Sequence, residues 1–375
     1  MRRISLKTLL IIVLCCFAIY IIVRYNFSDN NEKPTNWDYW IANTKQPKEN
    51  AKIVLSFVVC EGRFNESLNV VKSVLLFTRQ PVHLVIFADD IRRSQLNETL
   101  TRWQNSTVNQ FDFELHQIHF PEPDAEFWLN LFRKCSAQRL FFPELLPHID
   151  ATIYVDTDTL FLGPIEELWH QFSLFNESQI TGLAWEDNNP NIAWYPRFAK
   201  HPFYGKYGVN SGVMLMNLTR MRQFGWMEYI TPVMRTWRNH IPWGDQDIVN
   251  IILSQHTGAV HVLDCRYNYR ADQCAHGAAC AGAARGVFLL HGSRGSFYGD
   301  AQPAFRACYE VVAEHPPGLA SPSLVSRLDA RLSLAPASPC GTLKHSFLTV
   351  PADTLRALYP EEISHVQNVA KSVGL

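Results

Sequence analysis

The sequence lacks the glycine-rich loops with which many proteins bind nucleotide phosphates. No Gly-x-Gly-x-x-Gly follows the first strand-like segment and there is no phosphate-binding loop, which disfavours a dinucleotide site or a P-loop site. Blocks of Lys and Arg are also missing outside the N-terminus, and the formal net charge is −1. These absences exclude the basic surface that a nucleic-acid partner requires. A phosphorylated ligand would therefore have to be held in another way, such as through a metal ion.

The composition is that of a globular protein with an apolar N-terminal segment. Of the 375 residues, 47% are hydrophobic and 18% are charged, enough for one large α/β domain or two smaller ones. Arg2, Arg3 and Lys7 precede the uncharged run 8–23, and no small-x-small cleavage site follows, which favours a membrane anchor over a cleaved signal peptide. We expect a cytoplasmic tail (1–7), a transmembrane signal-anchor (8–24), a stem (25–50), a folded luminal domain (51–315) and a C-terminal extension (316–375). This type II orientation would place the protein in the ER or Golgi membrane.

Nine cysteines are present, two of them within the expected anchor. In an oxidising lumen most of the other seven should form disulfides, and their odd number leaves at least one unpaired. Cys274 and Cys280 flank a loop of small residues, which favours a local disulfide. A zinc site with His276 is the alternative, but no second pair of ligands at zinc-type spacing supports it.

Strand-like and helix-like segments alternate after residue 50. Residues 52–60 and 82–88 have the pattern of buried strands, and residues 65–77 and 92–103 follow them as helices. This alternation predicts an α/β fold with a mostly parallel mixed sheet covered by helices. In such a fold, ligands bind at the carboxyl ends of the strands.

Asp156 and Asp158 follow the apolar, strand-like run 152–155. Side chains two residues apart in an extended chain lie on the same face, so both carboxylates can reach one divalent cation, which can in turn hold a diphosphate. Three alternatives compete with this interpretation. An EF-hand loop would need an oxygen ligand and then glycine where Leu160 and Phe161 stand. A phosphoaspartate hydrolase would need a downstream lysine and acidic motif, which are missing, and an isolated pair of this kind can also be solvated in a turn.

Three later segments place polar residues at the ends of predicted elements. The run 208–218 begins with small residues that let a ligand approach the backbone, although a tight bend would have the same composition. Asp245 opens an apolar stretch, either as a functional carboxylate or as a helix N-cap. His291 follows the strand-like run 287–290, where a histidine can be structural or can complete a metal site. Asn217 begins an Asn-x-Thr triplet inside an apolar stretch, so we expect it to be structural rather than glycosylated.

Taken together, these segments resemble glycosyltransferase family 8. The similarity runs from about residue 52 to residue 310. Its motifs are Arg139-Leu140, the strand and aspartate pair at 153–162, Val209-Asn210-Ser211-Gly212-Val213, Gly244-Asp245-Gln246-Asp247 and His291-Gly292. The segments 194–206, 265–270 and 302–306 look like the glucoside xylosyltransferases in particular.

The resemblance implies a GT-A fold and a glycosyltransferase that moves xylose from UDP-xylose to the O-linked glucose of EGF-like repeats through an α1,3 bond. It also implies the cofactor Mn²⁺, coordinated by Asp156, Asp158 and His291. Other positions match residues of the family that bind the donor. Val58, Val59 and Cys60 match the segment that contacts uridine, and Arg139 and Arg294 match positions that face the diphosphate. Asn210, Ser211, Gly212 and Gln246 match further donor-binding positions, and Glu186 or Asp187 would contact the sugar hydroxyls.

The family retains the configuration at the anomeric carbon. Double displacement would need a carboxylate on the face opposite UDP, but the position closest to that face is Gln246, whose amide is a poor nucleophile. The resemblance therefore favours same-face transfer, in which a phosphate of UDP accepts the proton and Asp245 orients the reacting groups. Bulky Trp194, Tyr195 and Tyr204 could exclude the hydroxymethyl group of a hexose. The alternatives are another UDP-sugar donor (glucose, galactose or glucuronate) and an inactive, membrane-anchored binding protein.

Overall fold

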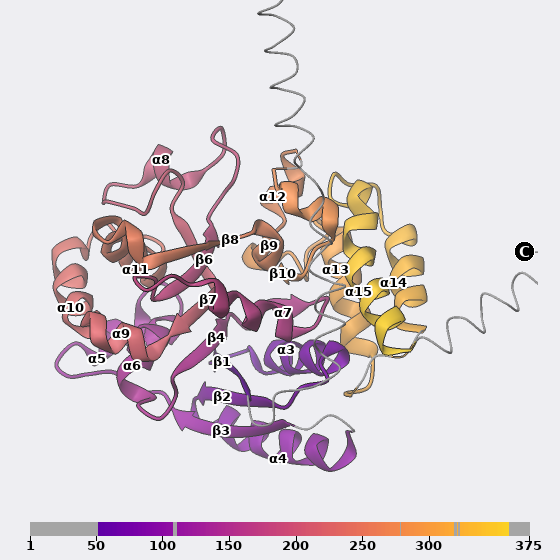
Figure 1. Cartoon of the computed structure of the whole chain (residues 1–375), viewed down its shortest axis with the longest axis horizontal. Coiled ribbons are helices and arrows are strands. Elements are labelled where there is room, and N and C mark those ends of the chain that lie inside the picture. The colour runs from indigo at the N-terminus through magenta and orange to yellow at the C-terminus, as the bar shows by residue number, and fades with distance from the viewer. Residues whose placement is uncertain (1–51, 108–110, 278, 319–320, 322, 360–375) are drawn as a thin grey trace, which may run out of the picture. The chain divides into compact units, whose positions relative to one another are not determined.

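A seven-stranded mixed sheet forms the centre of the fold in the computed structural model, which describes residues 52–107, 111–277, 279–318, 321 and 323–359. The strand order is β3-β2-β1-β4-β7-β6-β8 (Figure 1). Neighbouring strands are parallel except at β7, which is antiparallel to β4 and β6. This confirms the predicted α/β fold. The strands are β1 (Ile53–Val59), β2 (Val82–Ala88), β3 (Phe111–Gln117), β4 (Ala151–Val155), β6 (Thr181–Trp185), β7 (Val209–Asn217) and β8 (Val260–Leu263).

The first half of the sheet follows from the hydrophobic pattern. Helix α3 (Phe64–Phe77) connects β1 to β2, and α4 (Asp90–Ser106) leads from β2 towards β3, so the three strands run parallel. β1 and β2 are almost completely buried, as continuous apolar strands in a parallel sheet should be. The sequence pattern gives no indication of β3, because this edge strand is only half-buried and carries polar residues.

The direction of the strands reverses beside β4, and this reversal brings polar motifs together. β7 runs antiparallel to β4 with Val213 opposite Val155, and the N–H of Asp156 donates to the carbonyl of Gly212 at 2.8 Å. The first residues of β7 therefore lie next to the residues that follow β4. Open α/β sheets form their ligand sites at the carboxyl ends of the strands where the strand order reverses, which in this sheet is between β1 and the neighbouring β4.

A second, three-stranded sheet brings a distant segment to the same place. Its order is β5 (Thr159–Phe161), β10 (Leu289–His291) and β9 (Tyr269–Arg270). In it His291 lies opposite Thr159 on one side and Arg270 on the other. The N–H of Gly292 donates to the carbonyl of Asp158 at 2.7 Å. Because His291 is the last residue of β10, the strand pairing fixes its backbone beside the aspartate pair.

The C-terminal helices complete the core behind the small sheet. α13 (Pro303–Glu314), α14 (Ser323–Leu334) and α15 (Lys344–Leu358) lie side by side (Figure 1). Leu328 and Phe347 from these helices share a hydrophobic cluster with Tyr269 and Leu290 of the small sheet. The segment after residue 315, for which the sequence suggested no role, thus supports β9 and β10.

The other described helices connect these strands. They are α5 (Ala125–Asn130), α6 (Phe142–Leu145), α7 (Ile165–His170), α8 (Trp194–Phe198), α9 (Leu218–Phe224), α10 (Trp226–Trp237), α11 (Asp245–Gln255) and α12 (Asp272–Ala275), with short 3₁₀ helices η1 (Ser136–Phe141), η2 (Gln171–Leu174), η3 (Thr257–Ala259), η4 (Cys265–Asn268), η5 (Ala281–Arg285), η6 (Ser293–Gly295) and η7 (Gly341–Leu343). Asn217 caps α9 by accepting from the N–H of Arg220, which confirms a structural role for its side chain.

The expected tail, signal-anchor and stem lie outside the described residues. Among the helices that the structure does describe, none has the length and apolar character needed to cross a membrane.

Three disulfides tie the described part of the chain together: Cys60–Cys135, Cys265–Cys280 and Cys274–Cys340. The predicted local pair of Cys274 with Cys280 is wrong. η4 and η5 pack against each other, which brings Cys265 to Cys280, while Cys274 faces the C-terminal segment. The zinc alternative loses both thiolates for the same reason. Cys308 is buried and free, so the expectation of an unpaired cysteine is confirmed.

Candidate active site

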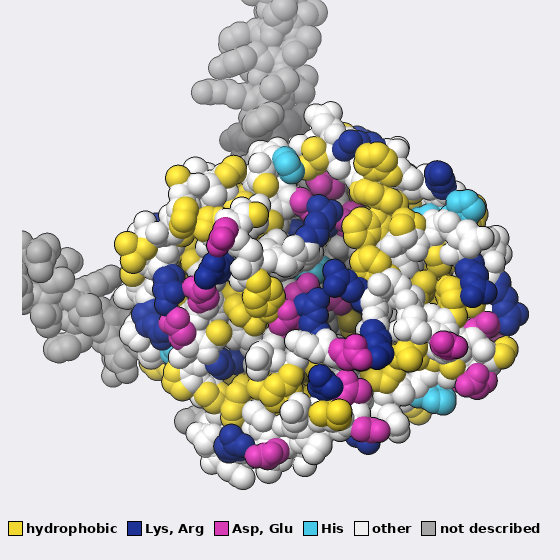
Figure 2. All heavy atoms as spheres, turned by 180° about the vertical axis from the view of Figure 1, so that it is seen from behind, with side chains coloured by type: hydrophobic (Ala, Val, Ile, Leu, Met, Phe, Trp, Pro, Cys, Tyr) yellow, Lys and Arg dark blue, Asp and Glu magenta, His cyan; other side chains and the backbone are white. Residues whose placement is uncertain are grey.

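A cavity of about 560 Å³ opens where the carboxyl ends of β1 and β4 meet the beginning of β7. Figure 2 shows a hollow surrounded by acidic and basic side chains, with hydrophobic side chains at its rim. The predicted site residues that line the cavity are Val58, Cys60, Arg139, Asp156, Asp158, Glu186, Asn210, Ser211, Asp245, Gln246, His291 and Arg294. Segments more than 200 residues apart in the sequence therefore meet here, as the motif pattern predicted.

Asp156, Asp158 and His291 come together as a possible set of metal ligands. The Nε2 atom of His291 lies 3.5 Å from Oδ1 of Asp158 and 3.8 Å from Oδ2 of Asp156. One ligand atom from each of the three residues lies within 4.8 Å of the other two. Two carboxylates and an imidazole suit a divalent cation such as Mn²⁺.

The orientation of His291 also fits metal binding. Its Nδ1 is 2.9 Å from Oδ1 of Asn268, and the Nδ2 of Asn268 donates to Oδ1 of Asn210 at 2.8 Å. Because Asn268 offers an acceptor, Nδ1 carries the proton and the lone pair of Nε2 faces the aspartates. Gly212 makes room for the imidazole, since a Cβ at this position would clash with the ring.

Arg139 joins the metal end of the cavity to the start of α11. It is only 4% exposed, and it lies 2.9 Å from Oδ1 of Asp156 and 2.8 Å from Oδ2 of Asp245. Its Nη1 also donates to the carbonyl of Ser211 at 2.6 Å. Burial alone would lower the pKa of Arg139, but the two aspartates raise it above its ordinary value. Arg139 thus holds two acidic side chains in place while it lines the cavity.

Asp245 is the first residue of α11 rather than its N-cap. Gly244 occupies the capping position, and no side chain caps the helix. Burial raises the pKa of Asp245, and the charge of Arg139 partly offsets this rise. The alternative role of Asp245 as a helix cap is therefore wrong, and its carboxylate is a partner of Arg139.

Four side chains form a polar network beside this pair. Oε2 of Glu186 accepts from Nδ2 of Asn210 at 2.7 Å and from Nε2 of Gln246 at 3.1 Å. Oε1 of Glu186 accepts from Nη1 of Arg270 at 2.6 Å. Asn210 also donates to Oε1 of Gln246 at 3.0 Å. Each amide is therefore fixed in orientation and presented to the cavity.

The charged groups of the cavity lie mostly in pairs. Its lining carries five carboxylates and six Lys and Arg side chains. Arg139 lies between Asp156 and Asp245, Arg270 pairs with Glu186, and Nε2 of His291 is 3.5 Å from Asp158. The fit to a divalent cation therefore rests on the ligand set of Asp156, Asp158 and His291 and not on the net charge of the cavity.

Comparison with known proteins agrees with this arrangement. The family model "Glycosyl transferase family 8" matches residues 54–282, more than half of the chain. The chain belongs to glycosyltransferase family 8. Glycosyltransferases with this fold use a divalent metal and a nucleotide-sugar donor, and the three ligands described above fit that metal.

Several relatives of this family 8 chain cover most of its length. Glucoside xylosyltransferase 1 of Danio rerio is 40% identical over 332 residues, which are 85% of this chain and 82% of the relative. Glucoside xylosyltransferase 1 of Mus musculus is 42% identical over 70% of this chain and 67% of the relative.

Solved structures show the GT-A fold. The apo form of mouse xyloside xylosyltransferase 1 has a TM-score of 0.50 at 21% identity, covering 65% of this chain and 98% of that chain. The galactosyltransferase LgtC, in complex with donor and acceptor sugar analogues, has a TM-score of 0.53 at 17% identity, with coverage of 71% and 98%.

Some residues named from the family pattern lie elsewhere. Val59 does not line the cavity, because its fully buried side chain packs in the core. Asp187 also lies outside the lining and accepts from the N–H of Asn189, so Glu186 is the acidic residue that faces the cavity. Gly212 is not part of the cavity lining, and its missing side chain leaves space for the imidazole ring of His291. Arg294 does line the cavity, but it is exposed and pairs with Asp272 at 3.1 Å.

The three aromatic residues expected to exclude a hexose do not line the cavity. Tyr195 is buried behind it, where its hydroxyl donates to Asp247 and accepts from Gln246 and Asn250. Tyr204 stacks on Trp185 away from the donor residues, and Trp194 packs against Trp243. The prediction that these three side chains exclude a hexose by direct contact is therefore wrong, and it is Trp243, the neighbour of Trp194, that lines the cavity.

Asn268 and Arg270 are important site residues that the sequence did not reveal. Both belong to the segment 265–270, whose likeness to one subfamily was recognised without roles for single residues. Asn268 orients the ring of His291, and Arg270 pairs with Glu186. The pairing of β9 with β10 brings both residues to the site, and no local sequence pattern encodes this pairing.

We expect Asp156→Asn and Asp158→Asn each to reduce transfer by about a hundredfold or more, because each change removes a charged ligand while preserving shape. Initial rates measured across a Mn²⁺ titration test this. Asp150→Asn, at the opposite end of β4, is the matched control and should retain wild-type rates. Normal turnover by either site variant in the presence of EDTA would contradict the metal site.

Asn268→Ala should weaken Mn²⁺ binding in the presence of UDP by about 10- to 100-fold, because Nδ1 of His291 loses its acceptor. Asn268→Asp, which keeps an acceptor oxygen, should bind Mn²⁺ more tightly than Asn268→Ala. Calorimetric titration of the UDP-bound proteins measures both. Equal affinity of the alanine variant and the wild type would show that Asn268 does not orient the histidine.

Proposed function

We propose that this protein transfers xylose from UDP-xylose to the O-linked glucose of EGF-like repeats, forming an α1,3 bond with retention of configuration. The observation that carries the proposal is the combination of a complete Asp156, Asp158 and His291 set with high identity to proteins named glucoside xylosyltransferases. An intact ligand set argues against the alternative of an inactive binding protein. The EGF-like acceptor rests on the family resemblance.

We assign a separate role to each group of residues in the site. Asp156, Asp158 and His291 would hold Mn²⁺, which as a Lewis acid would stabilise charge on the departing diphosphate. Arg139 holds Asp156 in position, since the two groups are 2.9 Å apart. Asn210 and Gln246 present fixed amides to the donor sugar.

The network around Glu186 favours same-face transfer. Glu186 is the carboxylate next to Gln246, but both of its oxygens accept hydrogen bonds, from Asn210, Gln246 and Arg270. A carboxylate held in this way is a weak nucleophile. In same-face transfer, the bond from C1 of xylose to the phosphate oxygen breaks, the O3 hydroxyl of the acceptor glucose bonds to C1, and its proton passes to the departing phosphate oxygen.

We also propose a type II membrane protein of the ER or Golgi. Positive Arg2, Arg3 and Lys7 before the apolar run 8–23 support this orientation. The three disulfides of the described part suit a luminal, oxidising compartment.

The donor and acceptor can be tested together. We expect the purified protein with Mn²⁺ to add one pentose from UDP-xylose to a glucosylated EGF-like repeat and nothing to the same repeat without glucose. Mass spectrometry of parallel reactions with UDP-glucose, UDP-galactose and UDP-glucuronate provides the comparison, with Asp158→Asn as the inactive control. Addition of a hexose or uronic acid, or of pentose to the bare repeat, would contradict the proposed function but leave the glycosyltransferase family unaffected.

A further inference from the structure

Two aromatic side chains, Phe132 and Trp243, stand together at the cavity. Both line it, and their ring centroids are 5.6 Å apart. The guanidinium of Arg294 lies 5.9 Å from the centroid of the Trp243 ring, and Trp194 supports the same ring from outside the cavity at 5.5 Å. The result is an apolar surface next to the charged groups described above. None of the metal, diphosphate or sugar contacts assigned so far uses it.

Phe132 is held in an unfavourable conformation. Its side chain is exposed, with 49% of the residue's surface accessible, and its backbone has a φ of 59°, in the left-handed region. A bulky residue in this region costs on the order of 1–3 kcal/mol unless the surroundings enforce it. Because the Phe132 side chain is exposed, it does not stabilise the hydrophobic core. Strain and exposure at one residue of a cavity wall indicate that the ring serves a ligand.

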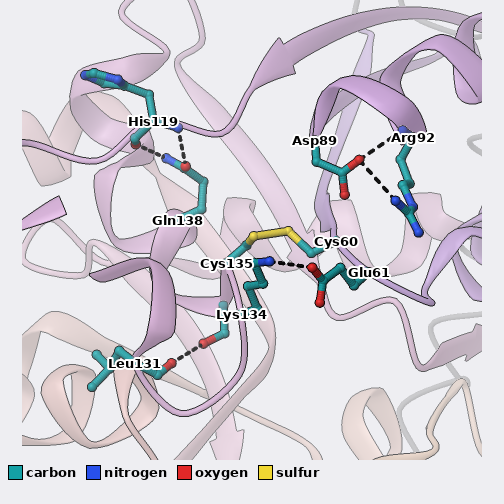
Figure 3. The surroundings of a disulfide bond; sticks show 10 residues. Cys60, Glu61, Asp89, Arg92, His119, Leu131, Lys134, Cys135 and Gln138 are labelled. Atoms are coloured by element: carbon teal, nitrogen blue, oxygen red, sulfur yellow. Dashed lines mark hydrogen bonds and ion pairs between the residues drawn. A yellow bond between two sulfur atoms is a disulfide. The ribbon is translucent and has the colours of Figure 1, made fainter. Parts of the chain in front are cut away.

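The surroundings do enforce this conformation. The disulfide Cys60–Cys135 fastens the loop that carries Phe132 to the end of β1, and Lys134 pairs with Glu61 across the same junction (Figure 3). Within the loop, the N–H of Cys135 donates to the carbonyl of Leu129 at 2.9 Å. The residues that follow Phe132 are therefore tied both to the end of β1 and to helix α5.

Gly244 provides the space into which Phe132 fits. A Cβ at Gly244 would lie 2.5 Å from the Cβ of Phe132, too close for any other residue. Gly244 directly precedes Asp245 and Gln246, so the aromatic pair lies beside the groups that face the donor sugar. This places Phe132 beside Asp245 and Gln246 in the wall of the cavity.

The chemistry of this surface suits a second sugar. A β-glucopyranose has axial C–H groups on both faces, which pack on aromatic rings, and hydroxyl groups around its edge, which need polar partners. An aromatic surface bordered by Arg294, Asp245 and Gln246 offers both kinds of contact. The donor sugar has its partners deeper in the amide network, which leaves the aromatic surface for the acceptor.

We propose that Phe132 and Trp243 form a platform that binds the ring face of the acceptor glucose and positions its O3 hydroxyl for transfer. This inference rests on the proposed function, because that function supplies a glucoside as the acceptor. Phe132 acts here as an acceptor-positioning residue. Stacking of the uracil base on the same ring is the competing occupant, and the test below distinguishes the two.

The test compares Phe132→Gly, Phe132→Tyr and Phe198→Ala in the full chain. Glycine adopts the left-handed conformation without strain, so Phe132→Gly should keep the thermal stability of the wild type while it removes the ring. We expect its KM for the glucosylated acceptor to rise about tenfold. Phe132→Tyr should retain a near-normal KM. Phe198 is similarly exposed at 52% and lies outside the cavity lining, so Phe198→Ala should behave as the wild type.

Calorimetric titration of UDP with Mn²⁺ present completes the experiment. The platform predicts that Phe132→Gly and the wild type bind UDP with the same Kd. An unchanged acceptor KM in Phe132→Gly would overturn the proposal, and so would a weaker Kd for UDP, which would assign the ring to the uracil. If the wild type transfers xylose to a different acceptor sugar, the proposed function is contradicted. The KM values of Phe132→Gly and the wild type for that acceptor then test the platform independently.

Discussion

The structure of the site depends on one buried guanidinium group. Arg139 lies between Asp156, which follows β4, and Asp245, which begins α11, and it also binds the backbone of β7 through Ser211. Removing one member of such a buried set would leave an uncompensated charge, at a typical cost of about 3–5 kcal/mol. Arg139 therefore fixes the distance between Asp156 and the helix that carries Gln246. One ligand atom of each of Asp156, Asp158 and His291 lies close enough to the other two for a divalent cation to bind there.

A chain of amide hydrogen bonds connects the two ends of the cavity. His291 binds Asn268, Asn268 binds Asn210, and Asn210 binds both Glu186 and Gln246. The orientations of His291 and of the Asn210 and Gln246 amides are therefore set by the same network. Buried networks of this kind are effective when every member is satisfied, and they lose several contacts when one member is removed. The small sheet, braced by the C-terminal helices and Cys274–Cys340, holds the histidine end of the network.

Much of this arrangement was predictable where a local pattern carried the information. Strands β1, β2 and β4 and helices α3 and α4 follow from hydrophobic periodicity, and two carboxylates after a buried strand indicated a cation. What depends on contacts between distant segments was not predictable. The sequence suggested pairing Cys274 with Cys280 because they are close along the chain, whereas packing of η4 on η5 decides the partners. Phe132 gave no indication of its role, because its exposure and left-handed backbone exist only in the folded loop.

We propose that Asp156, Asp158 and His291 hold one divalent cation together with the diphosphate of a nucleotide-sugar donor. The most direct measurement is anomalous diffraction at the manganese absorption edge from crystals of the protein grown with Mn²⁺ and UDP. We expect a single strong peak within coordination distance of an oxygen of each aspartate, Nε2 of His291 and the diphosphate. A manganese peak elsewhere, or bound UDP with no peak among these three residues, would contradict it.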